Sequence, residues 1–191
     1  MDPTEPPEPE DTSLAALAAR LLTTPSALAE LSTQEAEFVI GYTLLRHFPA
    51  GTTVIEQGER DRTGFMLLVV DGDVTVENVI VSRANPIVMT VLGPGSLVGE
   101  MGLLDGAPRA ASCVALSDVA AAILTRSALA RLIDDDAAIG AKLMIAISQR
   151  LAERLRESGQ KLRAYSQLTR AMQEEIVALD PASARLSGDL K

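Results

Sequence analysis

A glycine-rich segment at residues 99–112 carries the two side chains of this chain that are best suited to hold a small ligand. It places three glycines, a proline, Glu100 and Arg109 between two apolar runs. Glycine has no Cβ, so backbone N–H groups can crowd around a ligand. The planar guanidinium of arginine offers a fork of donors that suits a phosphate, and a glutamate accepts hydrogen bonds from sugar hydroxyls. One loop with both residue types predicts a site for a small phosphorylated sugar.

The order of these residues resembles the phosphate-binding cassette of cyclic-nucleotide-binding domains, G-E-[LM]-[AG]-x(5)-P-R-x-A-[ST]. The chain reads G-E-M-G-L-L-D-G-A-P-R-A-A-S here, with Glu100 and Arg109 at the matching places. The β-barrel of these domains usually opens with a second motif, F-x-x-G-x-x-[IV]-x-x-x-G-[DE]. This chain resembles that motif at Phe48, Gly51 and Gly58. The resemblance extends over residues 30–170.

The resemblance implies a role for each residue of the segment. Arg109 pairs with the charged cyclic phosphate, and backbone N–H groups of Gly99, Ala110 and Ala111 cradle the same phosphate. Glu100 accepts the 2′-hydroxyl of the ribose. The ligand is a 3′,5′-cyclic nucleotide, and cAMP is favoured because cGMP-selective eukaryotic members often carry threonine where this chain has Ala110. Two alternative ligands, cGMP and a cyclic dinucleotide, are left open.

The pattern of apolar and turn residues around this segment predicts a mainly β domain with flanking helices. Short apolar runs alternate with Gly, Asp and Pro turns, as in an antiparallel jelly-roll-like β-barrel, which is the cyclic-nucleotide-binding fold that the resemblance implies. The predicted strands are residues 53–56, 65–70, 74–81, 87–92, 112–116 and 119–124. We expect five parts: a disordered acidic, Pro-rich tail (1–12), N-terminal helices (13–46), the barrel (47–125), C-terminal helices (126–180) and a flexible tail (181–191).

Two helices are expected before the barrel. The first should bury one face, formed by Leu14, Leu17, Leu21 and Leu22. The second should begin at a Ser32 or Thr33 cap with Glu35 in its first turn, followed by an apolar stripe. That stripe contains Phe38, Val39, Tyr42 and Leu45. His47, the one histidine, should be structural or at the surface, at the start of the first strand.

After the barrel, Thr125 is expected to cap a short helix, and the acids at 134–136 to begin a long one. The long helix carries a heptad pattern over residues 144–179, which predicts a homodimer seam. A helix packed only on its own barrel is the alternative, which we disfavour because one barrel cannot cover six heptads. Gly159 lies inside the pattern and favours a bend or break there. The seam positions are Met144, Ser148, Leu151, Leu155, Ser158, Leu162, Tyr165, Thr169, Met172, Ile176 and Leu179.

Residues 148–172 of this helix resemble the dimer helix of the catabolite activator (CRP/FNR-type) family of transcription regulators. Ser158 matches the hydroxyl residue that contacts the base of the nucleotide there. Those regulators continue into a winged helix-turn-helix domain, for which the residues after Met172 are too few. The chain therefore resembles the sensor half of such a regulator, and we expect it not to bind DNA.

Composition narrows the function classes further. The net charge of −9 argues against nonspecific nucleic-acid binding. One cysteine, Cys113, allows no intrachain disulfide, and we expect it buried and inert. No signal peptide or membrane span is visible, so we expect a cytoplasmic protein.

No nucleophile elbow, metal-ligand spacing or Walker motif is present, so we expect no enzyme, no metal and no cofactor. We interpret the chain as a stand-alone cyclic-nucleotide sensor that signals through an unidentified effector protein. The alternative is the same fold binding a cyclic dinucleotide or no nucleotide and serving as a protein-interaction module.

Overall fold

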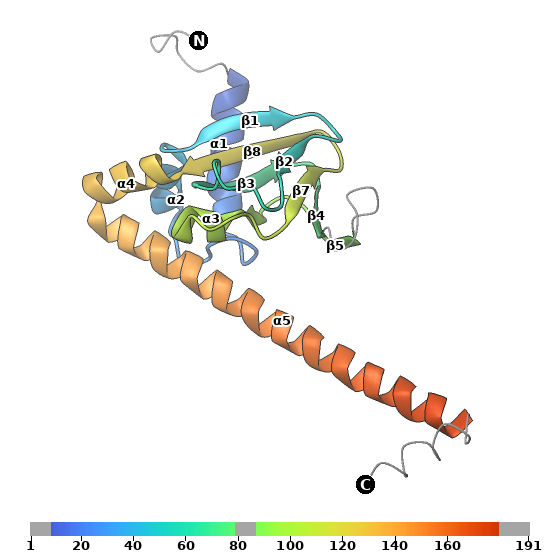
Figure 1. Cartoon of the computed structure of the whole chain (residues 1–191). Coiled ribbons are helices and arrows are strands. Elements are labelled where there is room, and N and C mark those ends of the chain that lie inside the picture. Colours follow the sequence, from blue (N-terminus) through green and yellow to red (C-terminus); the bar gives the residue numbers. More distant parts are fainter. Residues whose placement is uncertain (1–8, 79–86, 180–191) are drawn as a thin grey trace. The chain divides into compact units, whose positions relative to one another are not determined.

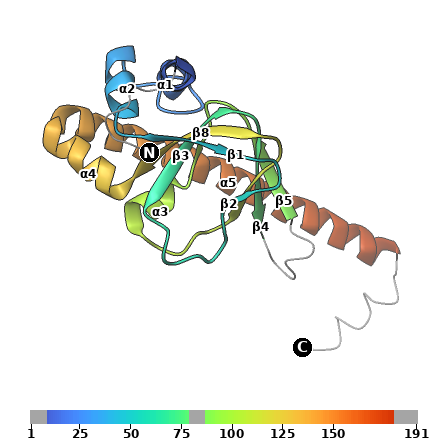
Figure 2. The same cartoon turned by 90° about the horizontal axis from the view of Figure 1, so that it is seen from above.

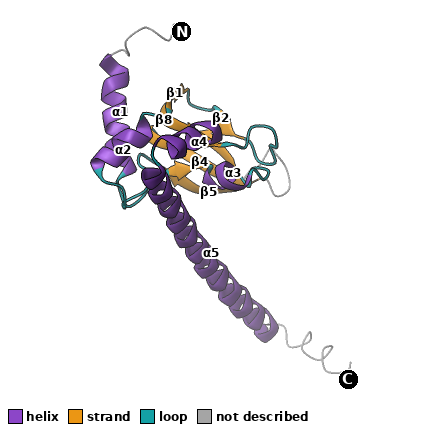
Figure 3. Cartoon of the chain, turned by 90° about the vertical axis from the view of Figure 1, so that its left-hand side faces the viewer, coloured by secondary structure: helices purple, strands orange, loops and turns teal. Residues whose placement is uncertain are grey.

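The computed structural model describes residues 9–78 and 87–179, and the chain divides into two compact units, residues 1–148 and 149–191. The first unit holds every described strand, and Figure 3 shows these strands gathered together with helices around them. The second unit contains the distal part of the long helix α5.

The described strands form two antiparallel sheets of four strands each. Their orders are β1-β8-β3-β6 and β2-β7-β4-β5, which confirms the mainly β prediction. The strands are β1 (Leu44–Phe48), β2 (Thr53–Ile55), β3 (Phe65–Asp71), β4 (Val74–Asn78), β5 (Ile87–Leu92), β6 (Leu97–Val98), β7 (Ser112–Ala115) and β8 (Val119–Thr125). The predicted strand at 74–81 has its last residues outside the described ranges.

The main core lies between the two sheets, where aliphatic side chains from both interlock. Leu67 and Val69 of β3 pack there with residues of β4, β7 and β8. Cys113 belongs to the same cluster and is buried, as expected. Alternate residues of β3 and β8 face the other way, and both strands are therefore apolar along most of their length.

The helices α1 (Pro9–Leu22) and α2 (Thr33–Ile40) cover the outer face of the first sheet (Figure 2). Leu22 of α1 and Val39 of α2 line a small cavity with Met66, Leu68 and Leu124 of the sheet. Small side chains on β8, Ala120 and Ala122 among them, let the helices approach closely.

The capping box of α2 is present as the sequence predicts. The Ser32 hydroxyl accepts the Glu35 N–H, and the Glu35 carboxylate accepts the Ser32 N–H at 2.7 Å. Glu35 also pairs with Lys142 of α5 at 2.7 Å. The hydrogen bond from Lys142, followed by those from Ser32, lowers the pKa of Glu35 to about 2.

Three expectations for the N-terminal part need correction. Helix α1 begins at Pro9, inside the stretch expected to be a disordered tail, while residues 1–8 lie outside the described ranges. On its expected apolar face Leu22 is buried and Leu14 and Leu21 are half-buried, but Leu17 is 38% exposed. Strand β1 begins at Leu44, where a helical stripe was expected, because α2 ends at Ile40 and every residue of β1 pairs with β8.

The C-terminal helices follow β8 directly. Thr125 caps α4 (Arg126–Asp135) by accepting the Ala128 N–H, as predicted. The Asp136 carboxylate accepts the N–H groups at the start of α5 (Ala137–Leu179), which is the role expected for that acidic run. Helix α5 is one continuous helix through Gly159, so the expected break is absent (Figure 1). An added Cβ at Gly159 would meet nothing within 4 Å.

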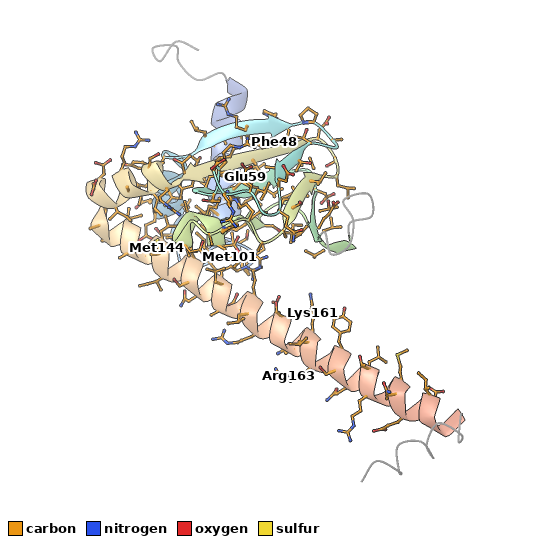
Figure 4. All side chains as sticks on the ribbon, viewed as in Figure 1. Phe48, Glu59, Met101, Met144, Lys161 and Arg163 are labelled. Carbon is orange, nitrogen blue, oxygen red and sulfur yellow. The ribbon has the colours of Figure 1, made fainter. Side chains whose placement is uncertain are left out.

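The distal part of α5 exposes its apolar residues. Leu155 is 74% exposed and Leu162 is 68% exposed. Tyr165, Met172 and Ile176 continue the same heptad positions and are also exposed. Figure 4 shows side chains projecting from this stretch, with Lys161 and Arg163 labelled. The distal part of the helix thus presents a stripe of exposed apolar side chains.

Candidate functional site

The glycine-rich segment forms a short helix and a loop between two strands. After β6, Gly99 adopts φ +84° and precedes α3 (Glu100–Asp105), and Gly106 adopts φ +68° just after it. The loop that follows is fixed on the β2–β3 connection by two backbone hydrogen bonds. The Arg109 N–H donates to the Glu59 carbonyl at 3.0 Å, and the Gly58 N–H donates to the Arg109 carbonyl at 2.8 Å. The two segments that resembled known motifs therefore lie side by side.

The guanidinium of Arg109 is buried within this arrangement, and the residue is only 5% exposed. Its Nη1 donates to the Gly99 carbonyl at 2.9 Å. Its Nη2 donates to the Arg62 carbonyl at 3.1 Å and to the Phe65 carbonyl at 3.0 Å. The guanidinium carbon also lies 4.3 Å from the centre of the Phe65 ring, within the range of a cation–π contact.

One nitrogen of this guanidinium, Nε, has no acceptor. Within residues 9–78 and 87–179, the Nε of Arg109 is the one buried side-chain nitrogen or oxygen without a hydrogen-bond partner. Burial lowers the pKa of Arg109, while Cys113, Glu59 and Glu100 act in the opposite direction. A buried cation with an unused N–H group is what a site for a small anion requires.

The glycines of the segment make room for Arg109 itself. A Cβ at Gly102 would lie 2.7 Å from Nη1 of Arg109 and 2.8 Å from the Thr63 carbonyl oxygen. A Cβ at Gly99 would lie 2.9 Å from Ile55 and 3.0 Å from the same Nη1. The sequence suggested that these glycines bring backbone close to a ligand. In the structure, these glycines also leave room for the side chain of Arg109 next to α3.

The remaining cassette residues lie in the same place. Glu100 is the first residue of α3 and is 2% exposed. Ala110 is exposed and Ala111 is half-buried, both directly after Arg109. The structure therefore brings together Gly99, Glu100 and residues 109–111, and their roles toward a ligand stay predictions.

Ser158 belongs to the second compact unit, on α5. It is exposed, and its hydroxyl donates to the Arg154 carbonyl one turn earlier at 2.8 Å. Its contact with the base of a nucleotide stays a prediction.

Sequence reasoning missed two residues that shape the site. Phe65 supplies both a carbonyl and a ring to Arg109, although only its place at the start of an apolar run was noted. Arg126 donates to two carbonyls of α3, at Gly102 and Leu103. Its position as the first residue of a helix gave no signal of this contact.

Comparison with known proteins agrees with the geometry. A sequence model of the cyclic nucleotide-binding domain matches residues 45–136. The chain carries a cyclic nucleotide-binding domain. The solved cyclic nucleotide-binding domain from Methylobacillus flagellatus is 26% identical, with a TM-score of 0.68 over 81% of this chain and 85% of that one.

CRP-like regulators are among the relatives of this domain. The CRP-like cAMP-activated global transcriptional regulator of Mycobacterium tuberculosis is 31% identical over 106 residues, 54% of this chain and 45% of that protein. The catabolite activator protein of Thermus thermophilus is 30% identical, with a TM-score of 0.62 over 76% of this chain and 63% of that one. The chain spans about half the length of the curated relatives it matches.

The described residues form neither a metal-binding cluster nor a membrane-spanning helix. In the described part of the chain, no group of three His, Cys, Asp or Glu residues is arranged to hold a metal ion. No described helix combines the length and the apolar character needed to cross a membrane.

Proposed function

We propose that this protein is a sensor that binds one 3′,5′-cyclic nucleotide per chain, with cAMP as the favoured ligand. The observation that carries the proposal is the buried Arg109, whose Nε–H lacks an acceptor. A cyclic phosphate bears one negative charge and exocyclic oxygens that accept such donors. The M. tuberculosis relative is described as cAMP-activated, which supports cAMP over cGMP.

The residues present fit such a ligand. Arg109 is already held by three carbonyls, so its charge is oriented before any ligand arrives. The backbone N–H groups of Gly99, Ala110 and Ala111 complete the phosphate contacts. Glu100 follows Gly99 directly and accepts the ribose 2′-hydroxyl.

Replacing Glu100 by alanine should weaken cAMP binding by about 1.5–3 kcal/mol, the usual contribution of a hydrogen bond to a charged group. Glu100→Gln, which keeps the size and one acceptor, should lose less. Replacement of the exposed Asp105 in the same helix by asparagine should leave the affinity unchanged. Titration calorimetry of the three variants tests the ribose contact, and equal affinities for Glu100→Ala and the parent would refute it.

The output of the sensor should pass through α5 and a partner protein. The exposed apolar stripe of α5 supports a homodimer through residues 144–179, in which Ser158 of one or the other subunit contacts the base. The net charge of −9 supports an effector that is a protein rather than DNA.

The competing function is a protein-interaction module that binds a cyclic dinucleotide or no nucleotide. A thermal-shift panel with cAMP, cGMP and cyclic dinucleotides separates the two functions. A ligand at 100 times its dissociation constant stabilises the folded state by about 2.7 kcal/mol. We expect the largest shift with cAMP, whereas a shift with a cyclic dinucleotide alone, or with none of them, would favour the competing function.

A further inference from the structure

Arg126 lies where three parts of the candidate site meet. As the first residue of α4, it donates its backbone N–H to the Gly64 carbonyl at 2.7 Å. Its side chain donates from Nε to the Leu103 carbonyl at 2.9 Å and from Nη2 to the Gly102 carbonyl at 2.8 Å. One residue thus connects α3, the segment that precedes β3, and α4.

Helix α3 needs contacts of this kind because it has only six residues. A helix this short is not stable alone, and the carbonyls of its last turn lack partners within the helix. The Gly106 N–H donates to the Gly102 carbonyl, and Arg126 supplies the donor for Leu103. A cation near a helix C-terminus also interacts favourably with the helix dipole.

The other end of α3 is held by the second arginine. Arg109 donates to the Gly99 carbonyl, the N-cap of α3, and to the carbonyls of Arg62 and Phe65. Arg126 donates to Gly64, between those two residues. Both arginines therefore hold α3 against residues 62–65, one at each end of the helix.

We propose that Arg126 is a positioning residue of the nucleotide site. It keeps α3 in the place where Gly99 and Glu100 can meet the ligand, and it makes α3 and the start of α4 move together. This inference rests on the proposed function for its ligand, but the contact with α3 can be tested without one.

The variant Arg126→Gln tests the contact, because the side chain is exposed and its loss opens no core cavity. Arg131→Gln, an exposed arginine on the same helix, is the matched control. Hydrogen exchange in the ligand-free chain should become about tenfold faster for amides of residues 100–106 in Arg126→Gln alone. Exchange in β3 and β8 should not change, whereas general destabilisation would accelerate those strands too.

The second arm measures cAMP affinity by calorimetry, at a temperature where circular dichroism shows both variants folded. We expect Arg126→Gln to bind about tenfold more weakly than Arg131→Gln and the parent. Added cAMP should slow exchange at residues 126–135 in the parent and less so in Arg126→Gln. Unchanged exchange in α3, or unchanged affinity in a parent that binds, would overturn this inference. A parent that binds no cyclic nucleotide would overturn the proposed function, while exchange in α3 would still decide whether Arg126 holds this helix.

Discussion

Replacing Arg109 by alanine should weaken cAMP binding by about 2–5 kcal/mol, or about 30- to 5,000-fold. The large effect has two physical sources. The phosphate loses its charged partner in a place where the residue is only 5% exposed, so water cannot replace it. The carbonyls of Gly99, Arg62 and Phe65 also lose their donor, so the cassette loses part of its support.

Two further variants separate these sources. Arg109→Lys keeps a positive charge, but an ammonium group lacks the planar fork that reaches the carbonyls and the Phe65 ring, so its affinity should lie between parent and alanine. Arg62→Ala should bind like the parent, because Arg62 contributes its backbone carbonyl and its side chain is 79% exposed. Calorimetric affinities for the three variants test the assignment. An Arg109→Ala chain that binds as tightly as the parent would place the site elsewhere.

Replacing Leu155 and Leu162 together by glutamate should convert a dimer into monomers. Both side chains are exposed on α5, and burying each against a partner helix contributes about 1.5–3 kcal/mol. The first unit should keep its melting temperature, because its core is built from other residues. Since Ser158 lies between the two leucines, cAMP affinity should fall as well, and ligand binding and dimerisation should strengthen each other by the same factor.

The matched control places two glutamates seven residues apart on the opposite face of the same helix. Ala164 and Ala171 are exposed and lie off the heptad seam, so the double variant should remain dimeric. Sedimentation of parent and both double variants, with and without cAMP, measures the difference. A parent that is monomeric at tens of micromolar in both states would contradict the dimer.

Local signals in the sequence predicted several elements well. The Ser32 cap and the Thr125 cap are present because each is decided by residues within one turn. The strand at 87–92 was predicted with its observed bounds, since its apolar run is set off by turn residues on both sides.

Elements that depend on distant partners were not predictable in the same way. Strand β1 has the sequence Leu-Leu-Arg-His-Phe, which lacks β-branched residues, and it forms because β8 pairs with it along its whole length. Strand β6 has only two residues, too few for any periodicity. His47 proves to lie within β1 rather than at its start.

The site shows the same division between local and distant information. The motif located Glu100 and Arg109 in one segment, and the structure adds that the backbone of Arg109 is hydrogen-bonded to the β2–β3 connection. The contacts of Arg109 with Phe65 and of Arg126 with α3 join residues far apart in the chain. Contacts between residues so far apart follow no fixed spacing in the sequence. They could therefore be found only in the folded structure.

Titration of cAMP into the parent chain by calorimetry tests the central claim most directly. We predict saturable binding with one site per chain, and loss of most of the affinity in Arg109→Ala. Absence of binding by cAMP, cGMP and cyclic dinucleotides at millimolar concentration, in a chain that circular dichroism shows to be folded, would contradict the sensor function.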